Sequence, residues 1–220
     1  MKKTLPTTAL AFAIATCAMT ALAGTFNWTG GAADDNWSSA DNWQEQSAPS
    51  AATDVIVFNM ASDTTTTFDL SVSPVIEKRG AGKLTVSGGS AYNNTVSTGS
   101  VFLYGGSIDL GGGKASMKQT ADGDAVLAAG TALYNATVTY SSAYNPGPCV
   151  GLKLPEGTVT FGAGATITDN SSYILSYGTP SGGATGTRAV ILDGATYNVK
   201  AGIYVCGANT TSSTIKASRP

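Results

Sequence analysis

The residues that could do chemistry in this chain are few, and the carboxylates are the first to consider. The closest pairs are Asp34/Asp35 and Asp122/Asp124. Residues i and i+2 of a strand lie about 7 Å apart on one face, so Asp122 and Asp124 could flank a sugar bond or share a calcium ion. However, Gly123 between them is typical of a turn, where Asp bonds the local backbone, and no cluster of Arg and Lys accompanies the pair. The pattern therefore favours a turn over a catalytic or calcium site.

Histidine is absent from the 220 residues of the sequence. Its absence excludes Ser-His-Asp and Cys-His catalysis and every His-ligated zinc site. Two cysteines, Cys149 and Cys206, follow the N-terminal segment. A disulfide between them is permitted in an exported chain but requires the fold to bring them together, and two separate buried thiols explain them equally well. We therefore predict no catalytic residue, no cofactor and no metal ligand.

The first 23 residues have the pattern of an export signal. Lys2-Lys3 precede a short apolar run, Ala9 to Met19, and Ala21-Leu22-Ala23 supply a small-x-small cleavage site. The run is too short for a membrane span, so we expect no membrane insertion by this chain. A lipoprotein site at Cys17 is disfavoured because Thr precedes it. We expect cleavage near Ala23 and export to the cell surface, the outer membrane or the medium.

Charge is sparse and mildly acidic, with 12 Lys and Arg against 14 Asp and Glu. The basic side chains are scattered along the chain, which disfavours nucleic acid and anionic membrane surfaces as partners. Gly, Thr, Ser and Ala are abundant, which penalises helix, and no window outside the signal shows a helical period. The mature length fits one folded, β-rich domain.

The elements that must position any site are best seen between Lys78 and Tyr104. Two apolar runs there, Leu84–Val86 and Val101–Leu103, alternate with Thr and Ser and are bounded by Gly and Asn. Branched residues pack well on a pleated face, and Gly and Asn accept the positive φ of tight corners. Such short strands suit a coil that keeps turning the same way.

This stretch resembles the autotransporter-associated β-strand repeat. The residues that carry the resemblance are Lys78, Gly80, Gly82, Leu84, Val86, Gly88, Tyr92 and Gly99. It departs from the repeat at Lys83, where Thr is usual, and at Val86 and Val101, where Leu is usual. The resemblance implies an all-β fold, a right-handed single-stranded parallel β-helix of the kind found in secreted or surface-displayed bacterial passengers.

A second motif precedes the repeat, in which Trp28, Trp37 and Trp43 each follow an Asn. It resembles the W-T-G-G…N-W…N-W segment that opens many such proteins, and Asp54–Asn59 resembles their D-x-V-x-F segment. Large rings with a polar N–H can close the end of a stacked fold, and they can also stack on sugars. The repeated Asn-Trp pairs favour a structural cap over a sugar platform.

We therefore expect three regions: residues 1–23 as signal, 24–74 as cap and first strands, and 75–220 as β-helix rungs. The glycine turns are unevenly spaced, as insertions in rungs of roughly 22 residues would produce. The expected function is that of an exported, non-catalytic passenger or adhesin, and the alternative is a protein that binds or cleaves a polysaccharide. The expected partners are host or environmental glycans or surface proteins, and an open last rung at Pro220 would allow edge-to-edge self-association. A translocator outside this chain and a truncated family member both remain open.

Overall fold

The computed structural model describes residues 23–88, 92–93, 101–119, 127–142, 157–170, 174–176, 188–199, 203–206 and 213–218. Within these residues the fold is all-β, and every pairing between its strands is parallel. The described part contains no α-helix, only one 3-10 turn, η1 (Ala40–Asn42). Nor does it contain a helix long and apolar enough to cross a membrane. The expectation of a β-rich fold with parallel strands is confirmed.

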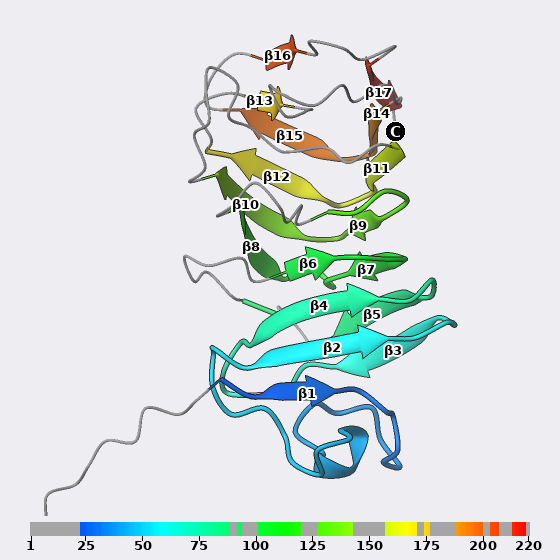
Figure 1. Ribbon diagram of the computed structural model, residues 1–220, viewed down its shortest axis with the longest axis vertical. Coiled ribbons are helices and arrows are strands. Elements are labelled where there is room, and N and C mark those ends of the chain that lie inside the picture. Colours follow the sequence, from blue (N-terminus) through cyan, green and yellow to red (C-terminus); the bar gives the residue numbers. More distant parts are fainter. Residues whose placement is uncertain are drawn as a thin grey trace, which may run out of the picture.

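The strands form four parallel sheets that rise along the long axis of the molecule, from β1 at the bottom to β16 and β17 at the top (Figure 1). Sheet 1 contains β1 (Thr25–Asn27), β2 (Val55–Asn59), β4 (Val75–Arg79) and β6 (Val101–Leu103). Sheet 2 contains β3 (Thr64–Thr67), β5 (Lys83–Ser87), β7 (Ser107–Asp109), β9 (Ala132–Tyr134), β11 (Gly157–Phe161), β14 (Arg188–Asp193) and β17 (Ser213–Ser218). Sheet 3 contains β8 (Lys114–Gln119), β10 (Thr137–Ser142), β12 (Thr166–Asp169) and β15 (Thr196–Val199). Sheet 4 contains β13 (Ile174–Ser176) and β16 (Ile203–Cys206).

The distance along the sequence between paired residues varies from one pair of strands to the next. Val55 pairs with Val75, 20 residues on. Gly157 pairs with Arg188, 31 residues on. From β4 onward every offset exceeds the roughly 22 residues expected from the sequence. The extra residues lie in the connections between strands, where insertions leave the pairing intact.

Side chains alternate between the interior and the surface, because successive residues of a strand point to opposite faces. In β5, Leu84 and Val86 are buried and their neighbours are half-buried. Leu84 pairs with Ile108, Ile108 with Leu133, and Leu133 with Phe161, so apolar side chains stack on one another through sheet 2. All four are at most 1% exposed. Burying each such side chain contributes about 1.5–3 kcal/mol, so this interior is the main source of stability.

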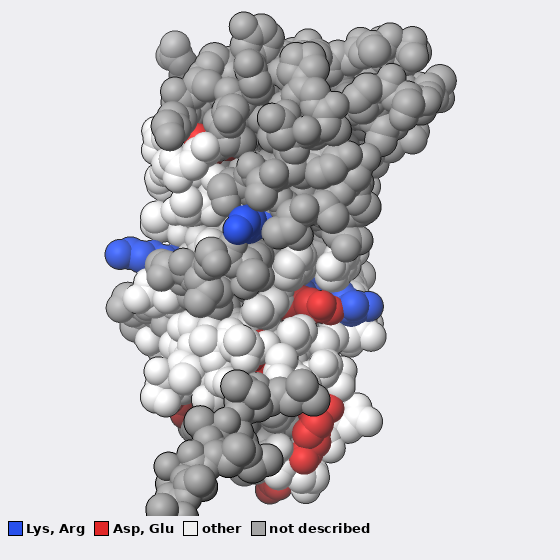
Figure 2. All heavy atoms as spheres, turned by 60° about the vertical axis from the view of Figure 1, so that its left-hand side comes forward, with Lys and Arg blue, Asp and Glu red and all other residues white. Residues whose placement is uncertain are grey.

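The outer surface carries little charge. On the face drawn in Figure 2, the basic and acidic side chains of the described residues are few and separated by uncharged ones. This distribution agrees with the scattered charge of the sequence.

Candidate functional site

The three tryptophans lie at the N-terminal end of the sheets, next to the first interior residues. Trp37 and Trp43 are fully buried. Trp28 packs edge-on against Trp43 with ring centroids 5.0 Å apart, and Trp37 packs edge-on against Phe68 at 5.2 Å. All three tryptophans also contact the ring of Phe58 on β2. The Trp43 indole N–H donates to the carbonyl of Trp37 at 2.8 Å, whereas that of Trp37 has no hydrogen-bond partner in the described structure.

The backbone around these rings pairs with the first strand of two sheets. Trp37 N–H donates to the carbonyl of Thr67 on β3 at 3.0 Å, and Thr67 N–H donates to the carbonyl of Asp35 at 2.8 Å. On the other side, Gln44 N–H donates to the carbonyl of Asn27 on β1 at 2.9 Å. β1 and β3 are the first strands of sheets 1 and 2. The segment therefore covers edges that would otherwise expose unpaired backbone groups.

Asn42 holds this segment together from within. Its side chain is fully buried. Its Oδ1 accepts from Ala32 N–H at 3.0 Å, and its Nδ2 donates to the carbonyls of Asp34 and Asn36, both at 2.9 Å. A buried amide is stable only when its polar atoms are bonded in this way. The repeated Asn-Trp pairs were the sequence signal for this residue, although they did not single out Asn42.

Lys78, the first residue of the repeat motif, points into the interior. It pairs with Phe58 on β2 and with Leu103 on β6, and all three side chains are fully buried. The aliphatic stem of the lysine thus takes the place of an apolar residue in the interior stack. Sequence analysis did not place this ammonium group inside the fold.

The Lys78 ammonium group is bonded to backbone carbonyls. Its Nζ donates to the carbonyls of Gly80 at 3.0 Å, Gly105 at 3.4 Å and Arg79. Burial lowers the pKa of Lys78 below its usual value, and the charge of Asp63 offsets this only in part. Since Gly80 and Gly105 belong to successive passages of the chain, the lysine joins one turn to the next.

The glycines of the motif are required by close contacts between successive turns. A Cβ at Gly82 would lie 2.1 Å from the carbonyl oxygen of Ser62, and one at Gly80 would lie 2.2 Å from that of Met60. Gly80 also has a φ of 61°, in the left-handed region. Gly88, with a φ of 112°, is held by the same two constraints.

The remaining motif residues belong to the interior or lie outside the described residues. Leu84, Val86 and Tyr92 are fully buried. Gly99, Asp122, Asp124 and Cys149 lie outside the described residues, and Cys206 lies on β16 without a described side chain. Pairing of the two cysteines therefore stays a prediction.

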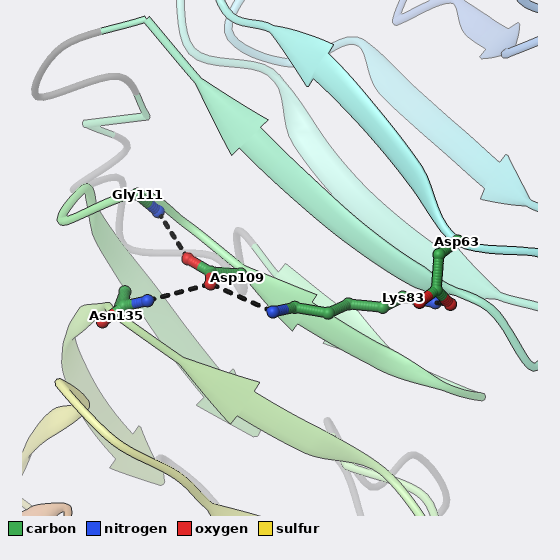
Figure 3. Close-up of polar contacts among 5 residues, drawn as sticks. All are labelled: Asp63, Lys83, Asp109, Gly111 and Asn135. Carbon is green, nitrogen blue, oxygen red and sulfur yellow. Dashed lines mark hydrogen bonds and ion pairs between the residues drawn. The ribbon is translucent and has the colours of Figure 1, made fainter.

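A polar cluster on the outer side of sheet 2 joins three neighbouring strands (Figure 3). Asp109 on β7 accepts from Lys83 Nζ at 3.2 Å and from the Asn135 amide at 2.8 Å through Oδ2, and from Gly111 N–H at 3.0 Å through Oδ1. Lys83 N–H in turn donates to Asp63 Oδ1 at 2.8 Å. Lys83 begins β5, and Asn135 directly follows β9.

The electrostatics of this cluster favour an ionised carboxylate. Burial by itself would raise the pKa of Asp109, but the hydrogen bonds from Gly111, Asn135 and Lys83, with the charge of the lysine, lower it overall. A carboxyl group with a lowered pKa is a poor proton donor at neutral pH. Its bonds to three strands suit it to holding them in register.

The ring of Tyr134 lies beside this cluster. Lys83 Nζ sits 5.1 Å from its centroid, in the range of a cation–π interaction. On the neighbouring strand, a Cβ at Gly162 would lie 2.0 Å from the Tyr134 ring, so the glycine makes room for it. The ring therefore spans from β9 to β11.

An aromatic pair lies on the outer side of sheet 1. Phe102 and Tyr104 have rings 6.1 Å apart and nearly parallel, at 6°. Tyr104 is 40% exposed, and the Arg79 guanidinium lies 5.2 Å from its ring centroid. Arg79 also pairs with Glu77 at 2.7 Å. This patch combines an exposed ring with two groups that can form hydrogen bonds.

Metal binding has little support in the described part of the chain, which contains no group of three or more His, Cys, Asp or Glu placed to hold an ion. Comparison with known proteins finds no matching family model, no matching curated protein and no matching solved structure. The function is therefore argued from the residues and their geometry.

Proposed function

We propose that this chain is an exported, non-catalytic surface protein, a structural passenger or adhesin built as a right-handed single-stranded parallel β-helix. The observation that carries the proposal is the unbroken series of parallel pairings in sheet 2, from β3 to β17. An in-register stack of this kind gives an elongated scaffold whose outer residues repeat at regular intervals.

Two further features support a scaffold rather than an enzyme. The tryptophan segment bonds to the first strands of sheets 1 and 2, as an end cap must do to prevent pairing with other chains. The charged side chains of the polar cluster bond to one another, and Asp109 in particular is held ionised by three donors. These contacts stabilise strands and leave no proton donor poised for a reaction.

Export can be tested by expressing the full chain in a Gram-negative host. We expect the protein in the periplasm, on the surface or in the medium, with Gly24 as its first residue by mass spectrometry. Replacing the small residue at the cleavage site, Ala23→Arg, is expected to leave the signal attached, and Ala32→Arg in the mature chain serves as control. An uncleaved wild-type chain that remains in the cytoplasm would contradict the proposal.

Binding of a polysaccharide is the second candidate, favoured by the exposed ring of Tyr104 beside Phe102 and the Arg79–Glu77 pair. A glycan array with the purified chain tests binding, and release of reducing sugar tests cleavage. We expect Tyr104→Ala to remove any glycan signal if this patch binds. Retention of the signal in that variant would place binding elsewhere, and release of reducing sugar would contradict a non-catalytic role.

A further inference from the structure

Sheet 3 presents two parallel ranks of polar side chains on its outer face. Its strands β10 and β12 read Thr-apolar-Thr, and β15 reads Thr-Tyr-Asn. These strands lie directly above one another on the left of Figure 1. The pairing places Thr137, Thr166 and Thr196 in one rank and Thr139, Thr168 and Asn198 in the other.

The side chains between the ranks fix which face points outward. Val138 and Ile167 are each 1% exposed and belong to the interior. Thr137 and Thr139 on either side of Val138 are exposed, and Thr166 and Thr168 on either side of Ile167 are half-buried. The ranks therefore lie on the surface of the sheet.

The ranks form a two-dimensional lattice. Paired strands lie about 4.8 Å apart, and residues i and i+2 of one strand lie about 6.7 Å apart. No shift of register interrupts the pairing of β10 with β12 or of β12 with β15. Threonine is also stiff at χ1, so each hydroxyl and methyl group is held in a narrow range of positions.

The chemistry of this face excludes several classes of partner. Its outward residues on β10, β12 and β15 carry no charge and no aromatic ring. Nucleic acids are bound largely through charge, and stacking on a sugar ring requires an aromatic face. What remains is a regular array of hydroxyl and methyl groups, which suits a partner that is itself a regular array of hydrogen-bonding groups.

We propose that this face binds the surface of ice. The ordered oxygens of an ice crystal repeat at spacings of a few ångströms, as the two ranks do. Each hydroxyl can order a water molecule, and the methyl groups between them can contact the water lattice without competing for hydrogen bonds. The many weak contacts act together because the sheet holds them in fixed positions. Ice is thus the partner of the proposed adhesin, although its binding can be tested without export.

The length of the face sets the expected size of the effect. Three strands span only about 10 Å along the axis. At the β8 end, Lys114 and Ser116 continue the ranks, so the uncharged array stops at Thr137. We therefore expect adsorption to ice and slower recrystallisation, with little depression of the freezing point.

The experiment is partition of the purified chain, signal removed, between slowly grown ice and the remaining liquid. We expect enrichment in the ice fraction. Thr139→Lys and Thr168→Lys place a charge inside the lattice and should each reduce the partition ratio by about tenfold or more, equivalent to about 1.4 kcal/mol. Thr65→Lys, at an exposed position of β3 on sheet 2, is the matched control and should partition as the wild type does. Circular dichroism verifies the fold of each variant, and Thr139→Val, which keeps the shape, provides a second test if a lysine variant fails to fold.

Each result decides the proposal. Loss of partition in the sheet 3 variants with retention in Thr65→Lys and partial retention in Thr139→Val supports it. Exclusion of the wild type from ice overturns it, and so does equal partition of all variants. A wild-type dimer in light scattering that Thr139→Lys dissociates, without ice binding, would assign the face to a second copy of the chain. Binding to crystalline cellulose or chitin in place of ice would equally overturn it.

Discussion

Replacing the buried lysine tests whether its ammonium group stabilises the fold. Lys78→Met keeps an unbranched side chain of similar length in the stack between Phe58 and Leu103 but removes the donor that serves Gly80 and Gly105. A buried ion pair can often be replaced by apolar residues at no cost. Here the acceptors are backbone carbonyls that stay in place, so the outcome depends on how much they lose.

The magnitude follows from those carbonyls. Each buried group left without its partner costs about 1–3 kcal/mol. Two such groups, offset in part by no longer burying a charge, give a loss of about 2–3 kcal/mol for Lys78→Met. Lys78→Ala adds a cavity worth about 2–5 kcal/mol, so its loss should reach about 4–7 kcal/mol. For a chain of this length, the methionine variant should lower Tm by about 4–12 °C.

The assay is urea unfolding of the purified chain followed by circular dichroism, with Lys114→Met as control. Lys114 is exposed on β8, so the same substitution there should change the free energy of unfolding by less than about 0.5 kcal/mol. A Lys78→Met variant as stable as the wild type, or more stable, would refute the reasoning. It would mean that the cost of burying the charge exceeds the value of its hydrogen bonds.

The pH dependence provides an independent check. The pKa of Lys78 is lower in the folded state than its ordinary value of 10.5. Between the lowered pKa and 10.5 the unfolded chain holds the proton and the folded chain does not, so this residue makes stability rise with pH. Lys78→Met should lack that rise when unfolding is measured at alkaline pH.

Three further substitutions test other contacts, each by the same urea assay. Gly82→Ala should cost about 1–3 kcal/mol or more, because its Cβ would meet the carbonyl of Ser62 at 2.1 Å; an unchanged midpoint would mean that the turn can relax. Trp43→Phe should cost about 1–3 kcal/mol, because the bond to the carbonyl of Trp37 is lost with part of the ring; a neutral result would deny the end segment a role in stability. Asp109→Asn should cost about 1–2 kcal/mol at pH 7. Since the pKa of Asp109 is lowered from 3.8, the wild type loses this contribution as the pH falls through the folded-state pKa, and the two curves should converge in acid.

The strands with alternating apolar residues were predictable from the sequence. Leu84–Val86 and Val101–Leu103 lie in β5 and β6 as expected. The local pattern decides these cases, because Leu, Val and Ile at every second position can be buried only on one face of a strand. The same argument anticipated parallel sheets without helices.

Other strands have no such local signal. Thr64–Thr67 form β3 although all four residues are threonine, and Lys114–Gln119 form β8 although half of that segment is polar or charged. Pairing with the neighbouring strands imposes their conformation. Tertiary context of this kind overrides local propensity.

The polar cluster was missed for a related reason. Asp109 bonds to Lys83 and to Asn135, each 26 residues away along the chain. Because the offsets between paired strands vary, no fixed period in the sequence connects these residues. The buried position of Lys78 was hidden in the same way, since only its register with Phe58 and Leu103 directs it inward.

Register also links stability to the proposed ice-binding face. A slip of one residue in β10 would turn Val138 outward and Thr137 and Thr139 inward, and would thus expose apolar area and bury unpaired hydroxyls together. The interior therefore fixes the two ranks of sheet 3, while the ranks themselves contribute little to the interior. Substitutions at Thr139 should consequently alter binding with little change in unfolding, whereas substitutions at Val138 should alter both. A variant at Val138 that unfolds more easily yet partitions into ice unchanged while folded would mean that the face needs less order than this argument requires.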